Sequence, residues 1–260
     1  MAPGWDLAEC VDGWQRAGLA GIGVTMGAVQ AVGVDRAVAL LRSSYLQVAN
    51  LQNLDPFHLE DPDRFAADLP RILAHLDLAA TVKADCVYAC CGPRGATDWS
   101  LAADRLTAQI EALLPHLHDR GVRLAVEPIH PIRQDLSFVN LATDVEDILA
   151  RVPDPAVGYV HDFWHLWWQR DAPAVARRTS ARVLSVQPSD HKAVTLRTLD
   201  RAVPGQGIIP IGDLVRALED GGYRGFYDLE VLSPDNEARG YDRTLADSIA
   251  GFAQAVGGFY

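Results

Sequence analysis

Apolar residues along the chain fall into two patterns, short continuous runs and longer stretches with helical spacing. Short runs that end in turn-forming or polar residues predict buried strands, whereas apolar residues at every third or fourth position predict helices with one buried face. Strands are predicted near residues 21–26, 45–51, 84–90, 122–126, 157–161, 183–187 and 225–230. Helices are predicted over residues 5–17, 34–43, 62–82, 98–120, 141–150, 171–181, 211–221 and 245–256.

The predicted strands and helices alternate along the chain, without a long linker or a low-complexity tract. Strands separated by helices form a parallel sheet with right-handed crossovers. Because 260 residues are an ordinary length for one (β/α)8 barrel, we expect residues 1–260 to form a single TIM-barrel domain of the α/β class. The first predicted element is the helix over 5–17, which in such a barrel would normally follow the first strand. We therefore expect that strand to be missing or atypical, and its gap to be closed by a rearrangement, a homo-oligomer contact or another partner chain.

Composition narrows the range of functions. The net charge is −11 and no run of Lys and Arg occurs, which argues against nucleic acid as a partner. No stretch has the roughly eighteen uncharged apolar residues of a membrane helix, and the first residues lack the pattern of a signal peptide. The four cysteines have no spacing typical of a disulfide framework or a zinc site. Free thiols fit a reducing compartment, so we expect a cytoplasmic protein.

The most informative stretch is Val157–Asp171, which reads VGYVHDFWHLWWQRD. An apolar strand here ends at Asp162, and His165 follows three residues later, so both side chains can face the carboxyl end of a sheet. The alternative is a core strand followed by a helix that Asp162 caps. The tryptophans of this stretch either offer a stacking wall to a ring-shaped substrate, with Trp164 as the candidate, or pack between helix and sheet.

Four predicted strands in succession end in a residue that can offer a metal ligand, namely Glu127, Asp162, Gln187 and Glu230. Active sites of barrels are built at the carboxyl ends of their strands. Three carboxylates in one mouth would repel one another unless a cation neutralised them. An oxygen-rich set of this kind suits Mn²⁺, Mg²⁺ or another hard divalent ion. We therefore expect one divalent metal ion at these residues.

Five motifs carry a resemblance to a known family. They are LAVEPIHP at 124–131, VGYVHDFWHLWW at 157–168, SVQPSDH at 185–191, RAVPGQGIIPI at 201–211 and GGYRGFYDLEVLS at 221–233. In this order they resemble the xylose isomerase-like TIM barrel superfamily. More narrowly, they resemble its sugar phosphate isomerase/epimerase branch, which includes inosose dehydratases and ketose 3-epimerases.

This resemblance implies roles for the residues at the strand ends. Glu127 and Glu230 match the paired glutamates that act as acid and base and bind the metal. Asp162 matches the metal-binding Asp, and His165 the His of the Asp-x-x-His motif that faces the substrate in catalysis. Gln187 falls where the family commonly has a metal-binding His, so here a neutral amide oxygen would take that place.

The resemblance and the loops also give candidates for contact with the substrate. Arg201, which precedes the PGQG loop, matches a family Arg that contacts substrate oxygen atoms, and its alternative is a solvated loop charge. Trp164 is the candidate for stacking. His58 lies in a loop with two prolines and is either a substrate contact or a solvated histidine.

The function that follows is a metal-dependent isomerase or epimerase of a sugar, polyol or related hydroxyketone. The metal, with manganese favoured over Mg, Co, Zn or Fe, would stabilise the enediolate left when one glutamate removes a proton. If a β-hydroxyl departs instead, the same site gives a dehydratase or another lyase. Elimination from a glycoside is a further alternative, and a non-catalytic barrel subunit is another. Phosphodiester hydrolysis, known in the superfamily, is opposed by the acidic charge.

Overall fold

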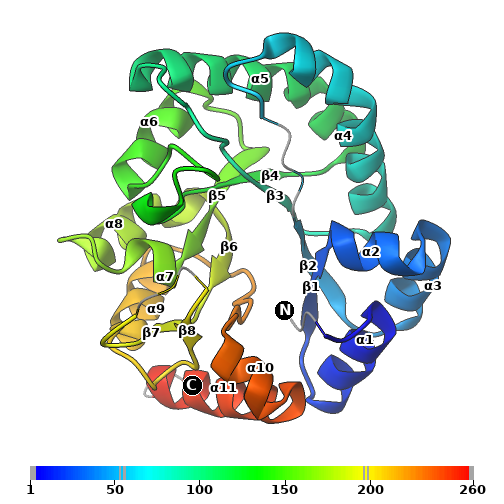
Figure 1. Ribbon diagram of the computed structural model, residues 1–260, viewed down its shortest axis with the longest axis vertical. Coiled ribbons are helices and arrows are strands. Elements are labelled where there is room, and N and C mark those ends of the chain that lie inside the picture. Colours follow the sequence, from blue (N-terminus) through cyan, green and yellow to red (C-terminus); the bar gives the residue numbers. More distant parts are fainter. Residues whose placement is uncertain (1–3, 53, 55–56, 196, 198, 258–260) are drawn as a thin grey trace.

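The computed structural model describes residues 4–52, 54, 57–195, 197 and 199–257. They form an α/β barrel in which helices surround a curled parallel sheet (Figure 1). The sheet has six strands in the order of the sequence. These are β1 (Gly21–Thr25), β2 (Gln47–Gln52), β3 (Val87–Cys90), β4 (Leu124–Glu127), β5 (Val157–Asp162) and β6 (Val183–Gln187). Each matches a predicted strand, and the α/β barrel is confirmed.

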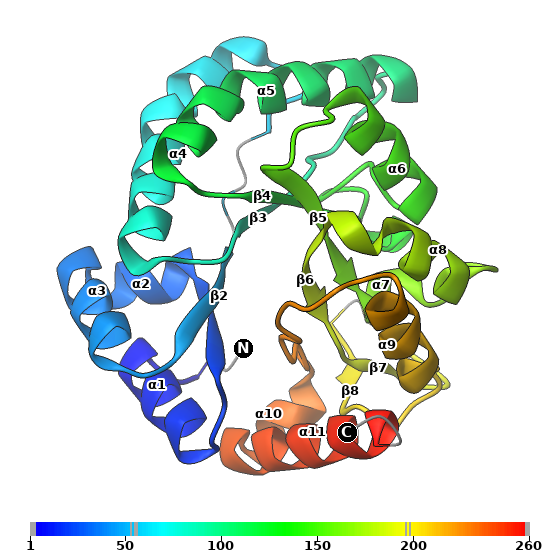
Figure 2. The same cartoon turned by 180° about the vertical axis from the view of Figure 1, so that it is seen from behind.

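The outer helices follow one another around the sheet, as the view from behind also shows (Figure 2). They are α1 (Leu7–Arg16), α2 (Met26–Val32), α3 (Val34–Ser43), α4 (Pro62–Val82), α5 (Trp99–Arg120), α6 (Ala142–Arg151), α8 (Ala172–Thr179), α9 (Ile211–Asp220) and α11 (Tyr241–Val256). Two shorter helices, α7 (Phe163–Leu166) and α10 (Pro234–Arg239), lie near the carboxyl ends of the strands. Helices α4 and α5 each bury an apolar stripe against the sheet, with Ile72, Leu76, Leu106 and Ile110 fully covered.

Local signals explain where the long helices begin and end. Asp61 accepts a hydrogen bond from the backbone N–H of Arg64 at the start of α4, and Pro62 takes the first helical position. Helix α5 ends at Gly121, whose φ of 62° places it in the left-handed region that closes helices. No described helix has the length and apolar character needed to cross a membrane.

The predicted strand near 225–230 is wrong as a strand and reduces to one isolated bridge, between Tyr227 and Val186 of β6. The segment does run beside β6, where the N–H of Asp228 donates to the carbonyl of Val186 at 2.8 Å and the N–H of Glu230 to Pro188 at 3.3 Å. Its apolar residues resemble those of a strand. Among the described residues, however, no regular ladder flanks it on the side towards β1.

The atypical part of the barrel lies between β1 and this 225–230 segment. The first described element is α1, so the expected gap in the first strand is confirmed for the described residues. Side chains rather than backbone ladders meet here, because a Cβ at Gly21 would lie 2.8 Å from the ring of Phe226. A pocket of about 190 Å³ remains along this line, bordered by Gly21, Asp228 and Trp14.

Candidate active site

The residues predicted at the four strand ends lie at the carboxyl edge of the sheet. Glu127, Asp162 and Gln187 are the last residues of β4, β5 and β6, and Glu230 ends the segment beside β6. All four side chains are buried. Asp162 is paired in register with Gln187, and the Nε2 of Gln187 donates to the Oε2 of Glu230 at 2.6 Å. The structure therefore brings Asp162, Gln187 and Glu230 together, and their roles in the site stay predictions.

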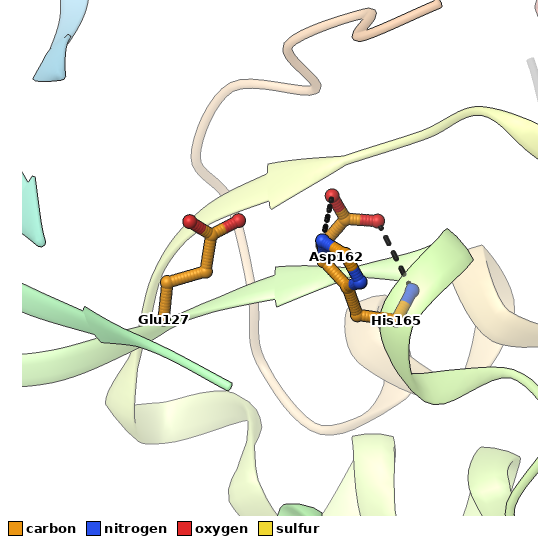
Figure 3. A group of neighbouring side chains, drawn as sticks. All are labelled: Glu127, Asp162 and His165. Carbon is orange, nitrogen blue, oxygen red and sulfur yellow. Dashed lines mark hydrogen bonds and ion pairs between the residues drawn. The ribbon is translucent and has the colours of Figure 1, made fainter. Parts of the chain in front are cut away.

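Helix α7 places His165 beside two of the carboxylates. One ligand atom from each of Glu127, Asp162 and His165 lies within 4.8 Å of the others (Figure 3). Asp162 also caps α7, because its Oδ1 accepts from the backbone N–H groups of Trp164 at 2.7 Å and His165 at 3.4 Å. The two sequence interpretations of Asp162 are thus compatible. One oxygen caps the helix while the other, Oδ2, faces the Nε2 of His165 at 3.8 Å.

Arg201 enters the cluster from a hairpin that the sequence pattern did not indicate. The hairpin pairs β7 (Asp190–His191) antiparallel with β8 (Arg201–Ala202). The following PGQG loop is held by Asp190, whose carboxylate accepts from the backbone N–H groups of Gly205, Gly207 and Ile209. Arg201 is only 3% exposed, so the alternative of a solvated loop charge is wrong.

The guanidinium of Arg201 contacts the predicted metal ligands directly. Its Nη1 lies 2.7 Å from Oδ2 of Asp162, and its Nη2 lies 3.4 Å from Oε1 of Glu230. Burial alone would lower the pKa of Arg201, but the carboxylates of Asp162 and Glu230 outweigh it and hold that pKa above its ordinary value. Burial raises the pKa of Asp162 and of Glu230, and Arg201 opposes the shift in both.

Both ring nitrogens of His165 face hydrogen-bond donors. The backbone N–H of His130 donates to Nδ1 at 3.1 Å, and Nη2 of Arg201, which can only donate, lies 3.3 Å from Nε2. Burial lowers the pKa of His165 well below its ordinary value, and the charge of Arg201 adds to this shift, so the ring is neutral. A neutral imidazole at this place can either bind a metal ion or form a hydrogen bond with a substrate.

The donor set fits a hard divalent cation. Glu127, Asp162 and Glu230 supply carboxylate oxygens, and Gln187 adds a neutral one. The Oε1 of Gln187 is buried and accepts no hydrogen bond from any described residue. The amide is held in that orientation because its Nε2 donates both to Glu230 and to the hydroxyl of Tyr88, at 3.2 Å. An unpaired buried acceptor is costly, and a cation would satisfy it.

Two further predicted residues lie in different surroundings. Trp164 is 2% exposed, stacks on His191 with ring centres 5.3 Å apart and has the Arg201 guanidinium 5.6 Å from its ring centre. These contacts agree with packing. The Nε2 of His58 lies 2.7 Å from Oδ2 of Asp68 on α4, and among the described residues no hydrogen bond or ion pair joins His58 to the cluster. The substrate contacts of Trp164 and His58 stay predictions.

Sequence reasoning missed Tyr88 and Asp228. Tyr88 lies two residues before Cys90 on β3, and Asp228 two residues before Glu230. Side chains two apart on an extended segment share a face, so Tyr88 and Asp228 point into the interior of the barrel. They lie below the strand-end layer, which is formed by Glu127, Asp162, Gln187 and Glu230. This spacing is the signal that could have found them. The hydroxyl of Tyr88 orients Gln187, as described above.

Comparisons with known proteins agree with this geometry. The family model of the xylose isomerase-like TIM barrel matches residues 4–249. Two curated relatives are a 3-dehydroshikimate dehydratase of Pseudomonas putida, 25% identical over 195 residues, and a fructoselysine 3-epimerase of Escherichia coli O157:H7, 28% identical over 144 residues. The matches cover 72% and 54% of this chain but only 29% and 50% of those proteins.

Solved structures match over nearly the whole chain. Protein SMc04130 from Sinorhizobium meliloti 1021 is 27% identical, with a TM-score of 0.89 over 97% of this chain and 94% of that one. The IolI protein, solved with a zinc atom, has a TM-score of 0.87 at 16% identity over 98% and 95%, which shows the shared fold. On the family match and the strand-end geometry together, the chain belongs to the xylose isomerase-like TIM barrel family.

Proposed function

We propose that the chain is a divalent-metal-dependent isomerase or epimerase that acts on a sugar, polyol or related hydroxyketone. The observation that carries the proposal is the gathering of Glu127, Asp162 and His165 within 4.8 Å, with Glu230 joined to them through Arg201. The relatives that support it are the fructoselysine 3-epimerase and D-psicose 3-epimerase, the latter at the level of the fold.

In this proposal Glu127, Asp162, Gln187 and Glu230 hold the metal, with manganese favoured. When bound, the metal supplies a Lewis acid that stabilises negative charge on the substrate oxygens. One of the two glutamates removes the proton from the carbon next to the carbonyl, and the other returns it. The ring of His165 forms a hydrogen bond with a substrate oxygen, and Arg201 binds another. Because these side chains are buried, water is kept from the reactive carbon.

A second candidate is a dehydratase that uses the same site. The match to 3-dehydroshikimate dehydratase over 195 residues favours it. Both reactions begin with removal of a proton next to a carbonyl, and they differ in whether a β-hydroxyl then leaves.

We also propose a cytoplasmic location, which the free state of Cys10, Cys86, Cys90 and Cys91 supports.

The experiment combines metal analysis with proton exchange. Purified protein is expected to hold one divalent ion per chain, and to exchange a carbon-bound hydrogen of a ketose, inosose or dehydroshikimate with deuterium from the solvent. Glu127→Gln and Glu230→Gln are each expected to lower this exchange by a factor of about 10² to 10⁴. Elimination products would favour the dehydratase.

The matched control is Glu111→Gln, which makes the same chemical change on the exposed face of α5. It is expected to leave exchange and metal content unchanged. Circular dichroism checks that the two site variants stay folded. If both variants fold and exchange at the wild-type rate, the glutamates are not the acid and base and the proposal fails.

A further inference from the structure

We propose that Arg201 is the resident counter-cation of the strand-end carboxylates, and that a divalent metal binds only by sharing Asp162 with its guanidinium. In this arrangement Arg201 balances part of the buried negative charge before any metal arrives. The second half of the proposal rests on the proposed metal site. The first half concerns the metal-free protein alone.

The contacts of Arg201 place its positive charge among the carboxylates. Nη1 reaches both oxygens of Asp162, at 2.7 Å to Oδ2 and 3.0 Å to Oδ1, and Nη2 lies 3.4 Å from Glu230. A hydrogen bond from Nη1 to Ser189 at 3.1 Å adds to the fixation. Asp162 is fully buried, so the pair is shielded from solvent and its attraction is strong.

The backbone around Arg201 holds the side chain in this place. Its N–H donates to the carbonyl of Leu232 at 3.0 Å, and its carbonyl accepts from Nδ2 of Asn236 at 3.0 Å. The ring of Trp164 lies beneath the guanidinium, with 5.6 Å between its centre and Cζ. Arg201 is thus part of the packed wall of the barrel and not a side chain that moves in from solvent.

Charge counting shows why one arginine is needed and why a metal can still enter. Glu127, Asp162 and Glu230 carry three negative charges when ionised, and His165 is neutral. Arg201 reduces the formal charge from −3 to −2, and a divalent ion would then bring it to zero. The metal and the guanidinium both need an oxygen of Asp162, however, and they repel each other at short range. The resident cation should therefore keep the metal-free protein folded and weaken metal binding.

A double-mutant stability cycle, measured as melting temperatures of the metal-free protein, tests whether Arg201 is the counter-cation. Arg201→Met is expected to lower the melting temperature by about 10 °C, because it leaves buried carboxylates without a cation. Asp162→Asn alone is expected to be destabilising, because Arg201 loses its closest partner. The double variant should melt well above Arg201→Met, since the amide needs no counter-charge and can still cap α7. If the two losses simply add, Arg201 is not the counter-cation.

The matched control is Arg182→Met. Arg182 is half-buried, and among the described residues its guanidinium donates hydrogen bonds to the backbone carbonyls of Val152, Asp154 and Val157 but to no carboxylate. Its loss should lower the melting temperature without coupling to Asp162→Asn. Arg201→Lys, which keeps the charge, should recover part of the stability lost in Arg201→Met. If Arg201→Met does not fold, the recovery in the double variant and in Arg201→Lys still decides the matter.

Metal titration tests the shared aspartate. Calorimetry with Mn²⁺ is expected to show binding about tenfold or more tighter in Arg201→Met than in the wild type, because repulsion and competition for Asp162 are removed. Mn²⁺ should also raise the melting temperature more in the variant. Equal or weaker binding in the variant contradicts the sharing. If neither protein binds Mn²⁺, the sharing and the proposed metal dependence fail together, while the stability cycle still decides the role of Arg201.

Discussion

Two aspartates inside the barrel show two ways of burying a carboxylate. Asp162, in the strand-end layer, is paired with the guanidinium of Arg201. Asp228, one layer below, accepts hydrogen bonds from the amides of Asn50 at 2.8 Å and Gln52 at 3.3 Å. Among the described residues no arginine or lysine forms an ion pair with Asp228. Asp162 is thus compensated by charge, and Asp228 by neutral dipoles.

The difference indicates what each layer is for. An ion cluster whose charges are only partly balanced can take up a further cation, as the strand-end layer is proposed to do. Neutral amide donors stabilise a buried carboxylate by hydrogen bonds, and they do not make a site for a further cation. The lower layer is also closely packed, since a Cβ at Gly23 would lie 2.5 Å from Asp228 and 3.0 Å from Asn50 and from Gln52. It supports the site from below.

The largest contrast is expected when each aspartate is replaced by alanine. Asp162→Ala leaves the buried Arg201 with Glu230, at the longer distance of 3.4 Å, as its one ion-pair partner among the described residues, and should lower the free energy of unfolding by about 3–5 kcal/mol. Asp228→Ala leaves Asn50 and Gln52, which already bond to each other at 3.0 Å, and should cost about 1–3 kcal/mol. Urea unfolding of metal-free protein at neutral pH measures both. Equal losses would mean that charge pairing does not distinguish the two aspartates.

A smaller effect is expected from Gly23→Ala, which tests the packing of the lower layer. The added methyl group forces Asp228 and both amides to shift, and should lower the free energy of unfolding by about 1–3 kcal/mol. In an Asp228→Ala background the closest contact is gone, so the same change should cost less. Gly27→Ala is the control, because a Cβ there meets nothing nearer than 4.0 Å. A loss at Gly23 that is the same in both backgrounds would contradict this packing.

Much of this architecture could be predicted because its signals are local. The helix over 62–82 has its aspartate cap and proline at the start, and the strand-end acids follow apolar runs that can be read along the chain. Parallel strands bring their carboxyl ends to one edge, so Glu127, Asp162 and Gln187 could be placed together. That residues 1–260 form one domain stays a prediction.

The rest depends on contacts between distant parts of the chain. Asn50 and Asp228 are 178 positions apart, and no local pattern pairs them. Arg201 turns inward because of a hairpin of two-residue strands, which is too short to leave a periodic pattern. The 225–230 segment has the composition of a strand, but whether it forms a ladder depends on a neighbour that lies at the other end of the sequence.

The smallest expected effect is the pH dependence of Asp228→Asn, which tests how well the neutral dipoles compensate this carboxylate. Burial raises the pKa of Asp228 above its ordinary 3.8, so the folded protein keeps this proton to higher pH than the unfolded chain does. Between the two pKa values the folded state binds more protons, and wild-type stability therefore falls as pH rises through that window. The amide cannot ionise, so the variant avoids this loss.

The variant should therefore match the wild type below pH 3.8 and be the more stable of the two at neutral pH, by up to about 1 kcal/mol, since an amide oxygen can accept the same two hydrogen bonds. Unfolding in urea across this range measures the difference, with the exposed Asp147→Asn as control. A difference of the opposite sign, growing with pH, would mean that Asp228 is stabilised as an anion. The two amide donors would then more than offset the cost of burying this carboxylate.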